Sequence, residues 1–280
     1  MNASGRALLG AVLLGMAGQA ATQDTGTVHP APFIPSPPST VDEMLRLAAV
    51  GPGDIVYDLG AGDGRVVIAA AKKFGARGVG VEIDERLIAQ ARRNAEQAGV
   101  ADRVRFLEQD LFKTDLREAT VVALYLSPNL NEKLRPALLT LAPGTRVVSH
   151  ASGMGGWRPD RKTSIRKDVL LWIVPARVAG RWRSLPGPGE PARALEFEIK
   201  QRFQEVSVDA RLDGAPAQVW EARVEGDRLS FVIVERTGTD DEAALYYQGR
   251  VAGSHIEGYV ARGVGAAREQ RLWRAARAVQ

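Results

Sequence analysis

The chain has 280 residues, with 37 Lys and Arg against 33 Asp and Glu, three His and no Cys. This length suits one large domain or two small ones, and an apolar content of 45% excludes a chain that is disordered throughout. No apolar run approaches the roughly 20 residues of a spanning helix, and the missing Cys excludes disulfides, thiolate nucleophiles and Cys-ligated metals, so we expect no metal centre.

The net charge of +4 is unevenly distributed. Residues 41–150 carry 15 basic and 15 acidic side chains, whereas residues 151–280 carry 21 basic and 17 acidic ones. The excess lies in the C-terminal half, where it favours an anionic partner or membrane surface but is a weak argument for nucleic acid.

The first residues resemble a secretory leader. Arg6 precedes an apolar stretch over 7–16, and small residues follow up to Ala20 and Ala21. We expect residues 1–21 to be a signal peptide that is cleaved near Ala20 or Ala21, which predicts a periplasmic or exported protein. The alternatives are an uncleaved anchor at the inner membrane and a cytoplasmic chain that starts at Met16.

A proline-rich arm is expected over residues 22–39. Five prolines between positions 22 and 38 fix the backbone in extended conformations. Phe33 and Ile34 are apolar for a solvated linker, so we expect these two side chains to lie against the folded domain.

Residues 40–178 read as alternating helices and strands. Apolar residues recur at helical spacing in three segments, and short buried runs bounded by glycine lie between them. This rhythm predicts βαβ units around a mainly parallel sheet, and hence an α/β fold. The predicted helices cover about 40–50, 65–74 and 84–98, and the predicted strands cover 55–57, 78–82, 104–107, 121–126 and 146–150.

The pattern changes after about residue 175. Apolar and charged residues alternate with a period of two over 195–199, 219–224 and 229–233, and Gly226 lies in a predicted hairpin turn. We expect a small antiparallel sandwich or barrel over 190–280, with Ser184–Pro191 as the boundary loop.

The strongest signal is a glycine-rich turn after the first strand. Gly60, Gly62 and Gly64 allow close approach of the backbone to a ligand, and the following helix offers unpaired N–H groups. Glu82 ends the next strand about 20 residues on, where a carboxylate can accept both ribose hydroxyls, and Asp110 ends the third strand, where it can accept from an adenine amino group. Together these positions predict a nucleoside site at the carboxyl edge of the sheet.

These motifs resemble class I S-adenosylmethionine-dependent methyltransferases. The G-x-G-x-G spacing differs from that of dinucleotide sites, and no phosphate-binding P-loop occurs. Further segments are similar to bacterial relatives of the ATP-synthase c-subunit lysine methyltransferase family, which are Dot1-like. The segments that carry the resemblance are Tyr57–Gly64, Gly80–Glu82, Gln109–Leu111, Pro32–Pro37, Tyr125–Pro128, Asn131–Pro136 and Gly144–His150.

The resemblance implies a Rossmann-like sheet that binds S-adenosylmethionine. It assigns cofactor contacts to the glycine turn and the strand ends, and it makes the proline arm a lid. The implied cofactor-binding residues are Phe33, Ile34, Asp58, Gly60, Ala61, Gly62, Gly64, Glu82 and Asp110.

The resemblance directs the transferred methyl toward the loop after the fourth strand. The Asn/Asp-Pro-Pro-aromatic tetrad of amino-group methyltransferases that act on adenine, cytosine or glutamine is missing there. We take Tyr125, Asn129 and Asn131 as candidates to position an amine and His150 as a candidate general base. For each residue a structural role in the core or a helix cap stays open.

The resulting hypothesis is a methyltransferase that acts on protein lysine. One alternative is a small-molecule methyltransferase with the same cofactor site. Another is an inactive S-adenosylmethionine-binding module whose β domain contacts an envelope partner. Nucleic acid is disfavoured as a substrate because the catalytic half is charge-neutral and lacks the tetrad. The sequence says nothing about oligomeric state.

Overall fold

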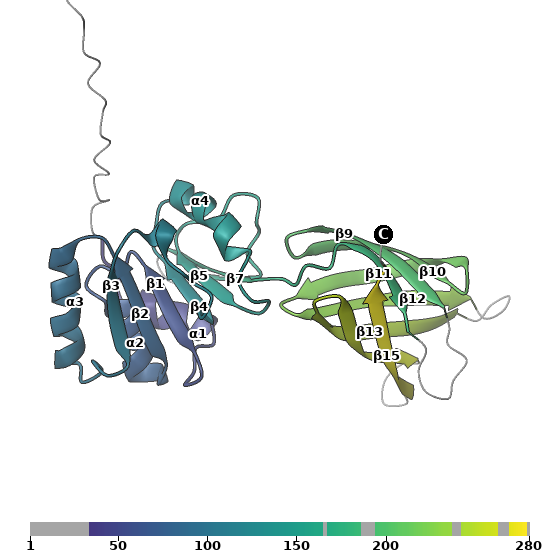
Figure 1. The fold of residues 1–280 in the computed structure, drawn as a ribbon, viewed down its shortest axis with the longest axis horizontal. Helices are drawn as coiled ribbons and strands as arrows, with labels where there is room; N and C mark the ends of the chain where they lie inside the picture. The colour runs from purple at the N-terminus through teal and green to yellow at the C-terminus, as the bar shows by residue number, and fades with distance from the viewer. Residues whose placement is uncertain (1–33, 165–166, 186–193, 237–241, 263–268, 279–280) are drawn as a thin grey trace, which may run out of the picture. The chain divides into compact units, whose positions relative to one another are not determined.

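The computed structural model describes residues 34–164, 167–185, 194–236, 242–262 and 269–278. An α/β domain comes first in the chain and a closed antiparallel barrel follows it (Figure 1). Within the described residues no helix is both long and apolar enough to span a bilayer. The predicted leader and most of the predicted arm lie outside the described residues.

The first domain is built on a seven-stranded sheet in the order β3-β2-β1-β4-β5-β7-β6. The strands β1 to β5 run parallel, whereas β7 is antiparallel to β5 and to β6. This confirms the predicted α/β fold with a mainly parallel sheet. The strands are β1 (Ile55–Leu59), β2 (Arg77–Glu82), β3 (Val104–Glu108), β4 (Val121–Leu124), β5 (Arg146–His150), β6 (Arg161–Ser164) and β7 (Asp168–Ile173).

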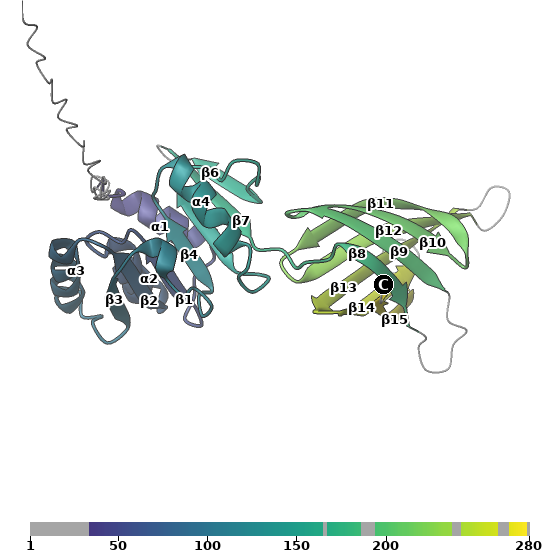
Figure 2. The ribbon, with the colours of Figure 1, turned by 45° about the horizontal axis from the view of Figure 1, so that its top comes forward.

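Helices cover both faces of this sheet. Buried side chains of α1 (Pro38–Leu47), α2 (Arg65–Phe74) and α3 (Glu85–Gln97) pack on one face, where α2 contacts both of the others. The helix α4 (Pro128–Leu138) lies on the opposite face (Figures 1 and 2). There its Leu134 and Leu138 pack together with Trp157 and Trp172. A short 3-10 turn, η1 (Leu111–Lys113), follows β3. The predicted helices are therefore present, and α4 is one that the sequence pattern did not predict.

The start of α1 differs from the expected domain boundary at residue 40. Pro38 is the first helical residue, and its fixed φ and missing N–H suit that position. Thr40 is buried inside the first turn. The helix therefore begins two residues earlier than predicted, because a proline at this place starts a helix instead of extending the arm.

The second domain is a closed barrel whose strands follow the order β10-β11-β12-β13-β14-β15-β8-β9 (Figure 2). The predicted boundary loop Ser184–Pro191 is wrong in its placement, because the preceding strand pairs with β9 and β15 and belongs to the barrel. The chain therefore enters the barrel at residue 180 and not at 190. The strands are β8 (Gly180–Ser184), β9 (Leu195–Arg202), β10 (Glu205–Leu212), β11 (Ala215–Glu225), β12 (Arg228–Arg236), β13 (Glu242–Ala252), β14 (His255–Arg262) and β15 (Glu269–Arg277).

Aromatic side chains fill the interior of the barrel. The ring centroids of Phe231 and Tyr247 are 5.0 Å apart, and those of Tyr247 and Trp273 are 5.1 Å apart. Phe197 and Trp182 extend the same cluster, and all five rings are buried. An eight-stranded barrel is just wide enough to be filled by side chains, and these residues fill it.

Candidate functional site

The strand order reverses between β1 and β4. The chain runs outward from β1 through β2 to β3 and then returns to β4 on the other side of β1. In open α/β sheets, ligands bind beyond the carboxyl ends of the strands at such a reversal. The glycine turn, Glu82 and Asp110 all follow carboxyl ends of these strands, so the structure brings together the predicted nucleoside-site residues.

The glycine turn is tied to the end of β2 by backbone hydrogen bonds. The N–H groups of Gly60 and Ala61 both donate to the Val81 carbonyl at 2.9 Å. Gly60 and Gly62 have φ of 83° and 54°, a region that costs an L-residue energy and glycine none. The turn is therefore held in a conformation that a side chain at these positions would strain.

Glu82 is part of this turn as well as the end of β2. One carboxylate oxygen, Oε2, accepts from the Gly62 N–H at 3.0 Å. The other, Oε1, accepts from the N–H groups of Ile83 and Asp84 at 2.8 and 3.2 Å. A carboxylate has about four acceptor positions. Glu82 is therefore fixed in place and still has capacity for a hydroxyl donor.

Asp58, near the end of β1, is a buried acid that lacks a donor. Its side chain is only 5% exposed, and no described residue donates a hydrogen bond to it. Burial, followed by the nearby carboxylates of Glu82 and Asp63, raises the pKa of Asp58 well above its ordinary value. A cationic group placed here would supply the missing donor and reverse that shift.

Gly64 and Arg65 organise the start of α2. A Cβ on Gly64 would lie 2.7 Å from the Phe106 ring, so this glycine permits close packing of α2 on β3. Arg65 pairs with Asp63 at 2.6 Å and donates to the Ser36 carbonyl at 2.8 Å. Gly64 therefore has a packing role here, beside the predicted cofactor role.

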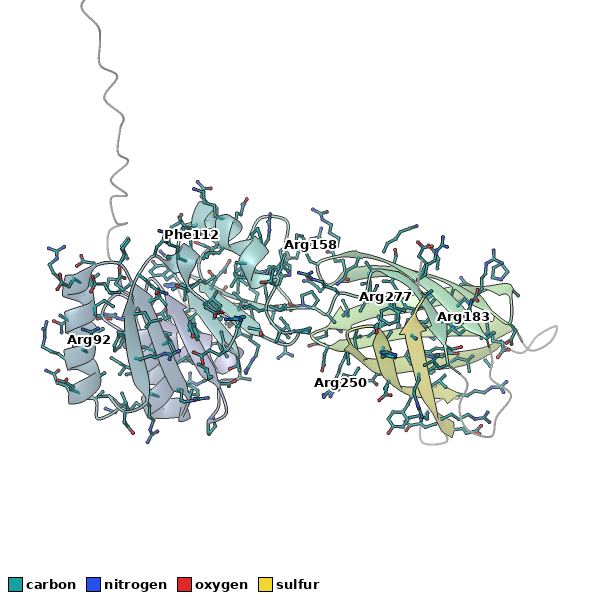
Figure 3. All side chains as sticks on the ribbon, in the orientation of Figure 1. Arg92, Phe112, Arg158, Arg183, Arg250 and Arg277 are labelled. Atoms are coloured by element: carbon teal, nitrogen blue, oxygen red, sulfur yellow. The ribbon has the colours of Figure 1, made fainter. Side chains whose placement is uncertain are left out.

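Asp110 caps η1 and lies next to exposed apolar side chains. One of its oxygens accepts from the Phe112 N–H at 2.9 Å. Phe112 is 47% exposed and Ile83, directly after Glu82, is 51% exposed. Figure 3 shows Phe112 at the edge of the sheet near α4. Glu82 and Glu108 are partners in the β2–β3 register, so these two apolar side chains follow neighbouring strand ends. They suit the face of a flat base, and the sequence reasoning missed both.

At the carboxyl ends of β4 and β5, Tyr125 and His150 form a stacked pair. Their ring centroids are 4.1 Å apart, and Tyr125 is half-buried whereas His150 is buried. His150 Nδ1 lies 2.8 Å from the Ser36 hydroxyl. Burial, and secondly the charge of Lys167, lowers the pKa of His150, so the imidazole is neutral at pH 7. The Lys167 Nζ lies 3.4 Å from the Tyr125 hydroxyl.

The two asparagines of this region lie in different environments. Asn129 is exposed at the start of α4. Asn131 is fully buried, and its amide nitrogen donates to Ser149 Oγ and to the carbonyls of Ser152 and Gly153 at 3.2–3.3 Å. The amide nitrogen of Asn131 therefore joins α4 to the loop after β5, whereas its Oδ1 is buried without a hydrogen-bond partner among the described residues.

The arm differs in part from the expectation. Phe33 lies outside the described residues, and Ile34 is 62% exposed and does not lie against the domain. Ser36 instead is 4% exposed and is bonded to both His150 and Arg65. The arm is therefore fixed by a polar residue that the apolar pattern did not reveal.

The residues present fit S-adenosylmethionine. The partnerless buried carboxyl of Asp58 suits the ammonium of the methionine portion, the free capacity of Glu82 suits a ribose, and Ile83 and Phe112 suit a base. Within the described residues no cluster of His, Asp and Glu is arranged to hold a metal ion.

Comparisons with known proteins identify the same portion of the chain. Residues 58–161 match the family described as the ANTKMT methyltransferase domain. A protein-lysine N-methyltransferase of Saccharolobus islandicus (strain REY15A) is 48% identical over 150 residues, which is 51% of this chain and 93% of that protein. The adenine nucleotide translocase lysine N-methyltransferase of Mus musculus is 34% identical over 129 residues, which is 46% of this chain and 56% of the mouse protein.

A solved structure is also similar to this chain. It is the crystal structure of an RNA methyltransferase from Salinibacter ruber in complex with S-adenosyl-L-homocysteine, 54% identical with a TM-score of 0.51. The similarity covers 52% of this chain and 96% of the other. The bound product form agrees with the cofactor that the site residues fit. The chain therefore belongs to the family of the ANTKMT methyltransferase domain, and it is an S-adenosylmethionine-dependent methyltransferase.

Proposed function

We propose that this chain transfers a methyl group from S-adenosylmethionine to the ε-amine of a lysine in a protein. The observation that carries the proposal is the 48% identity to a protein-lysine N-methyltransferase over 93% of that protein's length. The stacked Tyr125–His150 pair at the carboxyl edge supports it, because the face of the Tyr125 ring can receive and orient a lysine amine, as it does in its contact with Lys167 Nζ.

The cofactor-side residues are proposed to bind and orient. Asp58 would accept from the ammonium of the methionine portion and Glu82 from a ribose hydroxyl, whereas the backbone of Gly60 and Gly62 allows close approach. Asp110 keeps one carboxylate oxygen for the adenine amino group beside Phe112. When bound, S-adenosylmethionine supplies an electrophilic methyl on a sulfonium sulfur. Orientation alone contributes about 7 kcal/mol in favourable cases.

The acceptor-side residues are proposed to align a neutral amine. Tyr125 offers a half-buried ring and hydroxyl, and the exposed Asn129 offers an amide at the start of α4. His150 holds Tyr125 by stacking and is itself held by Ser36, so we assign it a positioning role. Asn131 keeps the loop after β5 against α4.

The test measures which molecule receives the methyl group. Purified protein is incubated with S-adenosylmethionine labelled in its methyl group, with a mixture of lysine-containing proteins in one arm, total RNA in a second and a metabolite extract in a third. Label recovered as ε-N-methyllysine after hydrolysis of the proteins is the expected result. Label found only in nucleosides or only in small molecules would replace the proposal with one of those activities.

Variants keep this test specific to the site. Glu82→Gln retains the size of the side chain and one oxygen but removes the charge, and we expect at least a tenfold loss of transfer. Glu85→Ala is the matched control, because Glu85 is an exposed acid on the first turn of α3. Binding of S-adenosylhomocysteine without transfer to any acceptor would favour an inactive cofactor-binding module.

A further inference from the structure

We propose that Lys167 of this chain is itself a methyl acceptor, so that the protein methylates its own catalytic edge. The inference rests on the proposed function, because it places a second substrate of the same chemistry at the same site.

The hairpin of β6 and β7 brings Lys167 to the ligand-binding edge. In the antiparallel pair of β5 and β7, His150 is the partner of Val169, so β7 begins where β5 ends. Ser164 is the partner of Asp168 and closes the β6–β7 hairpin at the same level. Lys167 directly precedes β7 and therefore lies at the edge that carries the glycine turn and Glu82.

The amine of Lys167 contacts the residue that we assign to the acceptor. Its Nζ lies 3.4 Å from the Tyr125 hydroxyl and 5.8 Å from the centre of the Tyr125 ring. Tyr125 directly follows β4, where the transferred methyl is proposed to point. A primary amine of the chain thus lies beside the same side chain that would align the amine of another protein.

Among the residues that the structure describes, no carboxylate pairs with Lys167. The neighbouring Lys162, on β6 of the same hairpin, pairs with Asp168 at 2.8 Å. No described carboxylate forms an ion pair with the exposed Lys167, so its amine is not engaged by an acid. This difference separates two lysines that are five positions apart on one hairpin.

The reaction balances as an ordinary methyl transfer. The Lys167 ammonium first loses a proton to water, and the Nζ lone pair then forms a bond to the methyl carbon. The bond between that carbon and the sulfonium sulfur breaks, and its electron pair stays on sulfur as S-adenosylhomocysteine forms. Up to three rounds are chemically allowed on one amine.

The experiment uses the full chain and S-adenosylmethionine carrying a CD3 group. After incubation the protein is digested with an Asp-specific protease, and the peptide containing Lys167 is analysed by tandem mass spectrometry. We expect CD3 groups on Lys167, at a fractional rate that is constant over a 100-fold range of protein concentration because the catalytic site and the acceptor lysine share one chain. CH3 groups already present on Lys167, and absent from Glu82→Gln, support the inference equally.

Two conservative variants and one internal control decide the outcome. Lys167→Arg keeps the positive charge, and it should lose at least 90% of the label on the chain. The Lys162→Arg variant should carry an amount of label on the chain that is within twofold of the wild type. A lysine-containing acceptor protein is present in every reaction. Label on that acceptor but not on Lys167 overturns this inference alone, whereas no label on either overturns the proposed function as well.

Discussion

Two similarly buried aspartates, one just before β1 and one within it, should respond in opposite ways when they are replaced by asparagine. Asp54, just before the strand, is 9% exposed, and it accepts from Thr120 Oγ1 at 2.7 Å and from the Arg146 guanidinium. Burial opposes its ionisation, but these hydrogen bonds outweigh burial and lower the pKa of Asp54. Asp58 is 5% exposed without any such donor among the described residues. We expect Asp58→Asn to stabilise the ligand-free protein and Asp54→Asn to destabilise it.

The expected magnitudes follow from the loss or gain of partners. Replacing a buried, unpartnered acid by its neutral isostere should add on the order of 1–3 kcal/mol to the free energy of unfolding at pH 8. For a chain of this size that is a rise in Tm of roughly 2–10 °C. Removing the charge of Asp54 should cost about 2–4 kcal/mol, because Arg146 is left without its partner.

The pH dependence of the stability independently gives the sign of each aspartate's contribution. The folded-state pKa of Asp58 is raised, so its contribution is fully present below the unfolded pKa of about 3.9 and is lost as the pH rises through the folded value. The difference in Tm between wild type and Asp58→Asn should therefore grow from pH 5 to pH 8. Asp54 has a lowered pKa, so its contribution is lost on acidification, and Asp54→Asn should differ least from wild type at low pH.

Calorimetry with S-adenosylhomocysteine completes this assay. If Asp58 accepts from the ammonium of the ligand, Asp58→Asn should weaken binding by about 10- to 100-fold, which corresponds to one charge-assisted hydrogen bond. Binding to the wild type should strengthen as the pH rises, because the ligand selects the ionised carboxyl. An Asp58→Asn protein with an unchanged or lower Tm at pH 8, next to an Asp54→Asn protein that behaves as expected, would refute the reasoning.

Four further predictions test other parts of the site and chain. Gly64→Ala should cost about 2–4 kcal/mol in urea unfolding, since its φ is 80° and its Cβ would lie 2.7 Å from Phe106. Asn131→Ala should cost about 1–3 kcal/mol in the same measurement because three acceptors lose their donor. Ser36→Ala should weaken S-adenosylhomocysteine binding roughly fivefold in calorimetry by releasing the arm. Mass spectrometry of the N-terminus should find a mature chain beginning near residue 21 in an exported fraction, and an intact leader would contradict cleavage.

The parallel strands and the barrel strands were predictable because each signal is local. A buried apolar run before a glycine turn marks β1, and the alternation of Leu195, Phe197 and Ile199 marks a strand with one face in the barrel. The strands β6, β7, β8 and β10 were not predicted. The exposed β6, Arg161–Ser164, has no apolar pattern, and Gly180–Ser184 of β8 is a strand because β9 and β15 pair with it. Pairing partners that are distant in sequence decide such segments.

The same distinction separates the two sides of the site. The cofactor side was predictable because its spacing lies within one βαβ unit, from Asp58 to Glu82. On the acceptor side, Ser36 and His150 are 114 positions apart and Lys167 and Tyr125 are 42 apart, so no local pattern reveals either contact. The sequence therefore indicated which polar residues could lie on the acceptor side. Only the fold shows which of them are exposed at the edge and which are buried in structural hydrogen bonds.

The groups around Tyr125 and His150 determine whether a protein side chain can take the proton from the acceptor amine. Among the described residues no carboxylate contacts Tyr125 or His150, and His150 already contacts the Ser36 hydroxyl through Nδ1. A dedicated acid–base pair is therefore not built into this edge. The Tyr125 ring instead faces the Lys167 amine, whose Nζ lies 5.8 Å from the ring centre, and an aromatic face of this kind attracts and orients an ammonium group. The contact that we propose to align a partner's lysine is therefore one that Lys167 already makes at the edge beside Tyr125.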